Sequence, residues 1–163
     1  MAEKMLVLDP DKCIGCHTCE MVCSLKHHDG CSQIRSRVRV ITDRTQDLSL
    51  PIMCQHCENP LCQKVCPTGA ISRDSATHAI LINRNKCLGC KMCIFVCPFG
   101  APSFDPIDRV TFKCDICEGD PECAKLCPSE AIQFVRNDKI GAAKRRDGVL
   151  KFMDIISNMV VGS

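Results

Sequence analysis

Cysteine is the residue type in this chain that could do chemistry, because 16 of its 17 copies fall into four groups of four. Two residues separate the first two cysteines of every group, and three residues separate the last two. The middle interval is two residues in the first and third groups, four in the second and five in the fourth. Thiols this close together either form disulfides or bind metal as thiolates. The groups are Cys13, Cys16, Cys19 and Cys23; Cys54, Cys57, Cys62 and Cys66; Cys87, Cys90, Cys93 and Cys97; and Cys114, Cys117, Cys123 and Cys127.

The cellular compartment decides between disulfides and metal. The N-terminal apolar stretch, residues 5–8, is four residues long and ends in an acid. This is too short for a signal peptide, and no stretch approaches the roughly 18 consecutive apolar residues of a membrane span. We therefore expect a cytoplasmic protein without a membrane span, in which thiols stay reduced and bind metal.

The spacing of the groups favours iron over zinc. Bacterial ferredoxins use a Cys-x2-Cys-x2-Cys-x3-Cys-Pro run, in which three cysteines hold one [4Fe–4S] cluster and the fourth ligates the other cluster of a pair. The third group matches this run in full. Zinc sites instead use two Cys-x2-Cys pairs with a longer spacer. Pro67, Pro98 and Pro128 follow the last cysteine of three groups and can end a helix there, whereas Ser24 takes this position in the first group. We predict four [4Fe–4S] clusters as cofactors, with Cys31 outside them.

The segments between the groups indicate how these loops are positioned. Residues 69–71 and 79–82 flank a polar turn, which predicts a β-hairpin between the second and third groups. Those two groups then form one module, and the first and fourth groups form another, with strands at residues 6–8 and 131–134. The predicted fold is α+β, with two bacterial-type two-cluster ferredoxin modules related by pseudo-symmetry. An outer module split over residues 1–31 and 106–137 surrounds an inner module at 49–105, with an insert at 32–48 and a docking tail at 138–163.

Two stretches contain no grouped cysteine. Residues 35–40 nearly alternate polar and apolar, which predicts an exposed strand. Seven apolar residues of the tail follow helical spacing and predict an amphipathic helix of about 13 residues. Because so short a helix is marginal alone in water, it must dock. We expect it to dock on another chain, either a catalytic partner or a second copy, rather than on its own ferredoxin body. The apolar residues are Val149, Leu150, Phe152, Met153, Ile156, Met159 and Val160.

Basic side chains beside the cysteines have two interpretations. A lysine near a cluster could stabilise its reduced form and raise its potential. The alternative, which we favour for any one of them, is a solvated surface charge. The lysines concerned are Lys12, Lys86, Lys91 and Lys113.

The histidines near the cysteines also have two interpretations. His17 and His56 lie inside cysteine loops and could donate a hydrogen bond to a sulfur. We expect both to be exposed loop histidines instead. His27 and His28 precede Cys31, where a further metal site is conceivable. We expect a free thiol with neighbouring surface histidines instead.

Segments 11–19, 54–57, 66–71, 86–93 and 113–117 carry a resemblance to a known family. The chain resembles the four-cluster ferredoxin subunits of multi-subunit redox enzymes, over about residues 3–135. These include subunits beside molybdenum or tungsten pterin oxidoreductases, hydrogenase and formate systems, and carbon monoxide dehydrogenase. The resemblance implies that each cluster takes three cysteines from one group and one from the paired group. The implied sets are Cys13, Cys16, Cys19 and Cys127; Cys114, Cys117, Cys123 and Cys23; Cys54, Cys57, Cys62 and Cys97; and Cys87, Cys90, Cys93 and Cys66.

The resemblance and the motifs together predict an electron-transfer subunit that is not itself an enzyme. Four thiolates on each cluster leave no open iron corner, and the chain contains no dinucleotide fingerprint, P-loop or nucleophile elbow. A net charge of +2 gives no basic excess for nucleic acid. The expected partner is a catalytic oxidoreductase subunit, with a tungsten or molybdenum pterin aldehyde oxidoreductase as the first choice. Hydrogenase, formate dehydrogenase and carbon monoxide dehydrogenase remain open, as does a free polyferredoxin.

Overall fold

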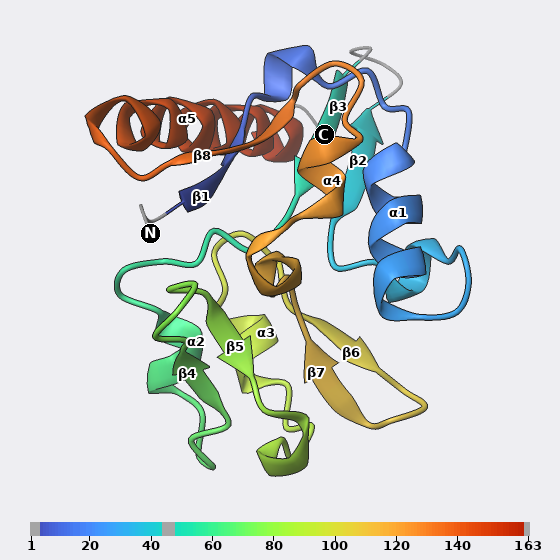
Figure 1. The fold of residues 1–163 in the computed structure, drawn as a ribbon, viewed down its shortest axis with the longest axis vertical. Helices are drawn as coiled ribbons and strands as arrows, with labels where there is room; N and C mark the ends of the chain where they lie inside the picture. The colour runs from blue at the N-terminus through green and yellow to red at the C-terminus, as the bar shows by residue number, and fades with distance from the viewer. Residues whose placement is uncertain (1–3, 44–47, 162–163) are drawn as a thin grey trace.

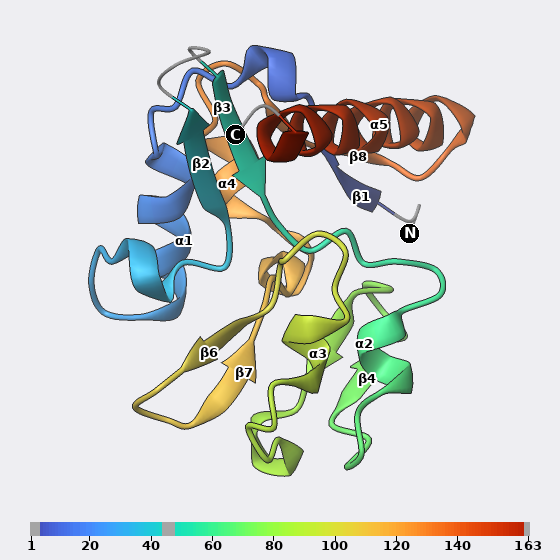
Figure 2. The ribbon, with the colours of Figure 1, turned by 180° about the vertical axis from the view of Figure 1, so that it is seen from behind.

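Four two-stranded antiparallel sheets and several short helices frame the cysteine groups in the computed structural model, which describes residues 4–43 and 48–161 (Figure 1). The half of the molecule that contains both chain ends holds the longer elements, and the other half holds the second and third cysteine groups (Figures 1 and 2). None of the helices in the described ranges is long and apolar enough to cross a membrane.

The two segments expected to close the outer module do pair. Strand β1 (Lys4–Leu8) runs antiparallel to β8 (Ile132–Arg136), with Leu6 opposite Phe134. Both strands are longer than predicted, and β8 begins one residue later. Leu6, Leu8 and Ile132 are buried, so this sheet contributes one wall of the main core.

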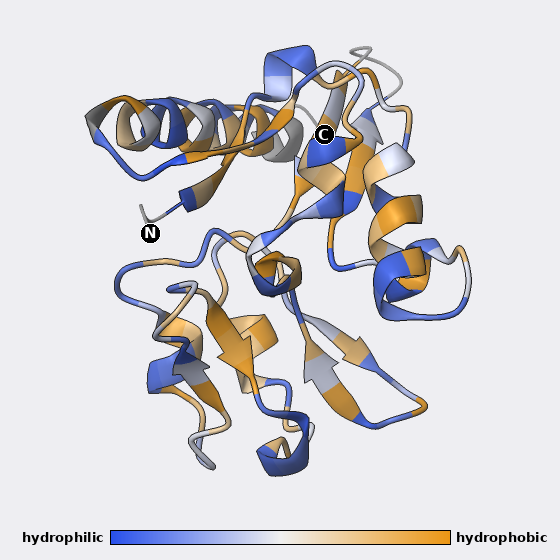
Figure 3. Ribbon diagram, viewed as in Figure 1, coloured by the Kyte–Doolittle hydropathy of each residue, from blue (hydrophilic) through white to orange (hydrophobic). Residues whose placement is uncertain are grey.

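The predicted hairpin between the second and third groups is also confirmed. Strand β4 (Ile71–Arg73) pairs with β5 (Ile80–Ile82). Figure 3 shows β5 as apolar along its length, and Ile71 and Ile80 are buried with Cys93 in a small core. A second hairpin of the same size, β6 (Ser103–Asp105) and β7 (Val110–Phe112), was not predicted.

The predicted strand in the insert is only partly correct. Residues 33–35 form a short 3-10 helix, η2 (Gln33–Arg35), and β2 (Arg39–Asp43) begins four residues after Arg35. Between these two elements, the buried hydroxyl of Ser36 donates to the carbonyl of Val38. Strand β2 pairs with β3 (Leu48–Ile52), so this hairpin crosses the predicted boundary between insert and inner module.

The length of the helix in each cysteine group depends on the residue that follows the last cysteine of that group. Helices α2 (Leu61–Lys64), α3 (Met92–Phe95) and α4 (Glu122–Lys125) end two residues before a Cys-Pro pair. Proline disfavours helical geometry in the residue before it, so the helix must stop there. Helix α1 (Thr18–His27) instead continues through Cys23, because Ser24 replaces the proline. Two further 3-10 helices, η1 (Pro10–Lys12) and η3 (Arg84–Lys86), directly precede the first and third groups. The segment η4 (Ile116–Gly119) lies within the fourth group, and its residues Cys117 and Glu118 have left-handed backbone conformations.

The C-terminal helix corrects the prediction for the tail. Helix α5 (Lys139–Val161) has 23 residues and begins after Asp138, whose carboxylate accepts the backbone N–H groups of Ile140 and Gly141. It lies across β1, where a side chain at Gly148 would overlap the carbonyl oxygen of Leu8. The lack of a side chain at Gly148 therefore lets the helix approach the sheet closely.

The prediction that the tail docks on another chain is wrong for the buried face of α5, because that face packs against the rest of the same chain. Phe152 is 5% exposed and contacts Leu50 and Ile52 of β3. Its ring centroid lies 5.8 Å from that of Phe99, which follows the third cysteine group. Helix α5 therefore joins the two halves of the molecule. Leu150 and Met153 are exposed, and the side chains of Met159 and Val160 lie outside the described residues.

Candidate metal centres

Two small cavities are each lined by four of the grouped cysteines. Each set contains the first three cysteines of one group and the last cysteine of another. Both agree with the exchange of the fourth cysteine that the resemblance implied. One cavity is lined by Cys87, Cys90, Cys93 and Cys66, and the other by Cys114, Cys117, Cys123 and Cys23.

The remaining eight cysteines are near neighbours in two further sets. Burial raises the pKa of Cys13, and the negative charges of Cys127 and Cys16 raise it further. Burial likewise raises the pKa of Cys62 to about 11, with Cys54 and Cys97 adding to the effect. Helices α1 and α4 lie in contact, as do α2 and α3, which brings the paired groups together.

These environments suit a positively charged metal centre. Buried thiols with thiolate neighbours stay protonated on their own, because each new negative charge is repelled and poorly solvated. Burial raises the pKa of Cys19 to about 12 and that of Cys123 well above its usual value. Iron ions would supply the positive charge that lets such thiols ionise. The four sulfurs that line each of the two cavities are the donor set of [4Fe–4S] clusters.

Backbone N–H groups of the loops point at several of these sulfurs. The N–H of Arg37 donates to Cys23 Sγ over 3.3 Å, and that of Ile116 donates to Cys114 Sγ over 3.4 Å. The sulfur of Cys87 accepts from Thr111 at 3.5 Å. Such donors stabilise thiolate charge and tune a bound metal centre.

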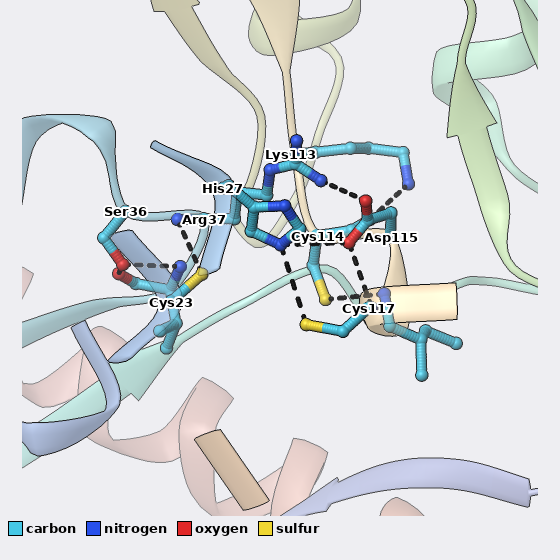
Figure 4. Close-up of polar contacts among 10 residues, drawn as sticks. Cys23, His27, Ser36, Arg37, Lys113, Cys114, Asp115 and Cys117 are labelled. Carbon is cyan, nitrogen blue, oxygen red and sulfur yellow. Dashed lines mark hydrogen bonds and ion pairs between the residues drawn. The ribbon is translucent and has the colours of Figure 1, made fainter. Parts of the chain in front are cut away.

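A polar network surrounds the set that contains Cys117 (Figure 4). Nε2 of His27 lies 3.6 Å from Cys117 Sγ and 3.4 Å from Oδ1 of Asp115. The other carboxylate oxygen of Asp115 forms an ion pair with Arg37. The expectation of a surface histidine beside Cys31 is therefore wrong for His27, whose side chain is only 12% exposed. Burial, followed by the charge of Arg37, lowers its pKa. Helix α1 extends past Cys23 and carries His27 to this position, which spacing alone does not reveal.

Comparison with known families decides the class of this site. The family described as 4Fe-4S dicluster domain matches residues 45–137, and the one described as 4Fe-4S binding domain matches residues 4–25. The chain belongs to the family of iron–sulfur electron-transfer subunits. Sixteen of its 17 cysteines, in four groups of four, fit four [4Fe–4S] clusters.

Relatives of this iron–sulfur subunit occur in several enzyme systems. Formate hydrogenlyase subunit 2 of Escherichia coli (strain K12) is 32% identical, over 91% of this chain and 90% of that protein. The polyferredoxin-like subunit of aliphatic sulfonate oxidoreductase of Pyrococcus furiosus is 35% identical, over 75% of this chain and 70% of its own length. A chain of the active-site complex BamBC of benzoyl coenzyme A reductase has a similar fold, with a TM-score of 0.50, 23% identity and 98% coverage of both chains.

The two loop histidines of this iron–sulfur subunit differ from each other. His17 is partly exposed, and its Nδ1 contacts Glu20 at 2.7 Å rather than a sulfur. His56 is not the exposed histidine we expected. Its Nδ1 accepts the N–H of Ile80, its Nε2 is buried, and burial together with Lys113 holds its pKa well below the usual value. Cys31 is exposed, and its role as a free thiol stays a prediction.

The four lysines beside the cysteines of this subunit also divide into two classes. Lys12, Lys86 and Lys91 are exposed, which agrees with solvated surface charges. Lys113 is 4% exposed, so that interpretation is wrong for this residue. A buried lysine could not be recognised from sequence, because each of Lys12, Lys86 and Lys113 directly precedes the first cysteine of its group.

Proposed function

We propose that this chain is a non-catalytic subunit that holds four [4Fe–4S] clusters and relays single electrons between a catalytic redox subunit and another carrier. The observation that carries the proposal is the pair of cavities that are each lined by four cysteines drawn from two groups. The charges of Cys127 and Cys16 near Cys13, and of Cys54 and Cys97 near Cys62, support two further sets of the same kind. In the proposed sets each cluster has four cysteine ligands, which leaves no iron corner open for a substrate.

The proposed ligand sets are those that the resemblance implied. Support comes from the two cysteine-lined cavities and from the neighbouring thiolates that raise the pKa of Cys13 and Cys62. When bound, each cluster supplies one-electron oxidation and reduction. The chain's own residues hold the irons through thiolates, donate backbone N–H groups to the sulfurs and exclude water. The sets are Cys13, Cys16, Cys19, Cys127; Cys114, Cys117, Cys123, Cys23; Cys54, Cys57, Cys62, Cys97; and Cys87, Cys90, Cys93, Cys66.

The division into two pseudo-symmetric modules is part of this proposal. The 3-10 helices η1 and η3 directly precede the first and third groups, which supports a repeated loop. His17 and Lys91 both adopt left-handed backbone conformations at equivalent positions of those loops. The hairpins β2–β3 and β6–β7 span the module boundaries at residues 48–49 and 105–106, so they connect the modules.

For the partner, we propose a catalytic oxidoreductase subunit in the cytoplasm. The similarity to subunits of formate hydrogenlyase and aliphatic sulfonate oxidoreductase supports a partner of this class. Within it we place a tungsten or molybdenum pterin aldehyde oxidoreductase first, with hydrogenase, formate dehydrogenase or carbon monoxide dehydrogenase as the alternatives. Anaerobic affinity purification of the tagged chain from its own cells, with metal analysis, should yield a stoichiometric pterin protein. Recovery of the chain alone would favour a free polyferredoxin.

The cluster proposal is tested by metal analysis of two matched variants. Anaerobically prepared protein should be brown and contain about sixteen iron and sixteen acid-labile sulfide atoms. Cys97→Ala should lose iron from one cluster, whereas Cys31→Ala should match the parent protein. Zinc without sulfide in the parent, or full iron content in the Cys97→Ala protein, would refute the proposed sites.

A further inference from the structure

Lys113 carries a buried ammonium group between two of the proposed cysteine sets. Its Nζ donates to Cys54 Sγ over 3.3 Å, to the carbonyl oxygen of Cys114 over 3.2 Å, and to the carbonyl of Ile80. Cys54 belongs to the second group and Cys114 to the fourth, so the side chain bridges the inner and outer modules. Figure 4 shows Lys113 beside Cys114 at the start of the fourth group.

The surroundings make sulfur the counter-charge of this ammonium. Among residues 4–43 and 48–161, no carboxylate forms an ion pair with Lys113. Cys54 and Cys114 lie close enough for the charge of one to raise the pKa of the other. A cation between two such sets interacts with both, and little solvent is present to screen it.

We propose that Lys113 raises the reduction potentials of the two centres held by the Cys54 and Cys114 sets, at the place where an electron passes between modules. This inference rests on the proposed function. Each reduction adds one electron, and so one negative charge, to a centre beside the ammonium group. The buried positive charge stabilises that added charge and therefore favours the reduced form. Lys113 acts on the electron carriers through their surroundings and ligates no iron.

The chain supplies its own control. Lys86 precedes Cys87 as Lys113 precedes Cys114, but Lys86 is exposed. Its charge is screened by water and salt, so its removal should leave every potential nearly unchanged. Lys113→Met and Lys86→Met therefore make the same change of charge at the same covalent distance from a ligand, and differ in burial.

The test is an anaerobic redox titration with dithionite as the electron donor, followed by electron paramagnetic resonance, on the full chain. In Lys113→Met, at least one and at most two of the four midpoint potentials should fall. We expect the equilibrium constant for one-electron reduction to drop at least tenfold, which corresponds to about 59 mV. The other midpoint potentials should remain unchanged, and all four potentials of Lys86→Met should match those of the parent protein. Lys113→Gln, which keeps a donor without the charge, should shift the same potentials in the same direction.

Three results would overturn the proposal. The first is an unchanged set of potentials in Lys113→Met or Lys113→Gln protein with full iron content. The second is an equal shift in Lys86→Met. The third is loss of iron from both Lys113 variants, which would make the residue structural only. The proposed function fails separately, if the parent protein itself lacks about sixteen iron atoms or four titrating centres.

Discussion

The half of the molecule that contains both chain ends, called the outer half below, contains far more regular structure than the other half. That inner half holds the second and third cysteine groups. In the outer half, α1 has 10 residues, β1 and β8 have five each, and α5 adds 23 residues across them. In the inner half, the helices have four residues and the strands of the hairpin have three. Both halves hold eight of the grouped cysteines, so the difference lies in what surrounds them.

The cores of the two halves differ in the same way. The inner core that contains Ile71 and Ile80 includes a cysteine, Cys93, and further cysteines pack against it. The core beneath α5 is built from Leu50, Ile52 and Phe152, with no cysteine. We infer that the inner half depends on its thiolates and their metal for stability, whereas the outer half also has the apolar core beneath α5, against which Phe99 packs.

Removing the clusters should have the largest effect on this comparison. With anaerobic chelation of iron, we expect loss of stable tertiary structure, because metal binding contributes much of the folding free energy of small metal domains. Amide hydrogen exchange should rise first and most in β4 and β5, and least in β1, β8 and α5. A cooperative thermal transition in iron-free protein, or uniform exchange across both halves, would contradict this.

Truncating Phe152 should remove the apolar support of the outer half. Phe152→Ala is expected to lower the free energy of unfolding by about 3–5 kcal/mol, the usual cost of deleting a buried aromatic ring. Leu150→Ala is the control, since Leu150 on the same helix is 59% exposed and should change little. Denaturant unfolding of iron-loaded protein measures both. Equal effects of the two substitutions would mean that α5 does not pack through Phe152.

Exchanging Ser24 for proline should make the first group resemble the other three. Ser24→Pro removes a backbone donor inside α1 and the hydroxyl bonds to Gly30 and Ser32, at a cost of roughly 3 kcal/mol. The helix should end before Cys23, with loss of helical circular dichroism and displacement of His27. Pro98→Ser, the reciprocal change, should be mild because α3 already ends at Phe95. A stable Ser24→Pro protein with unchanged helicity would show that the residue after the last cysteine does not set helix length.

Adding a methyl group at Gly148 should separate α5 from β1. Gly148→Ala would place a carbon atom against the carbonyl oxygen of Leu8, so a cost of about 1–3 kcal/mol is expected despite the better helix propensity of alanine. Gly30→Ala provides the control, because its added carbon would meet nothing within 4 Å. Thermal unfolding of both variants gives the comparison. A stabilised Gly148→Ala protein would exclude the close contact.

Removing the cap of α5 should have the smallest effect. Backbone N–H donation from Gly141 lowers the pKa of Asp138, so its stabilising effect is present above the unfolded-state pKa and is lost as pH falls through the lowered value. Asp138→Ala should lower the unfolding midpoint slightly at pH 7, and Asp138→Asn, which keeps a capping oxygen, should lower it less. Identical midpoints for Asp138→Ala and the parent protein would show that the cap is not needed.

Local spacing was sufficient to predict the cysteine groups, the closing strands and the hairpin at β4 and β5. A cluster loop is a local object, because three of its cysteines lie within a few residues of one another. A hairpin likewise depends on a turn between two apolar runs. Helix α5 was harder to predict, because Gly141 and Gly148 disfavour a helix in isolation. Their advantage lies in the close approach of the helix to the backbone of Arg136 and Leu8, which only the tertiary structure shows.

Sequence alone therefore determined what this protein binds, since the identity and spacing of sixteen thiols specify iron–sulfur chemistry wherever the loops end up. Only the tertiary structure decided which polar groups reach those thiols. Lys12, Lys86 and Lys113 occupy the same place before a cysteine, yet only Lys113 is buried, against Cys54 from a segment 59 residues away. Burial depends on which distant segments pack together, and that information is spread over the whole chain rather than held in any local motif.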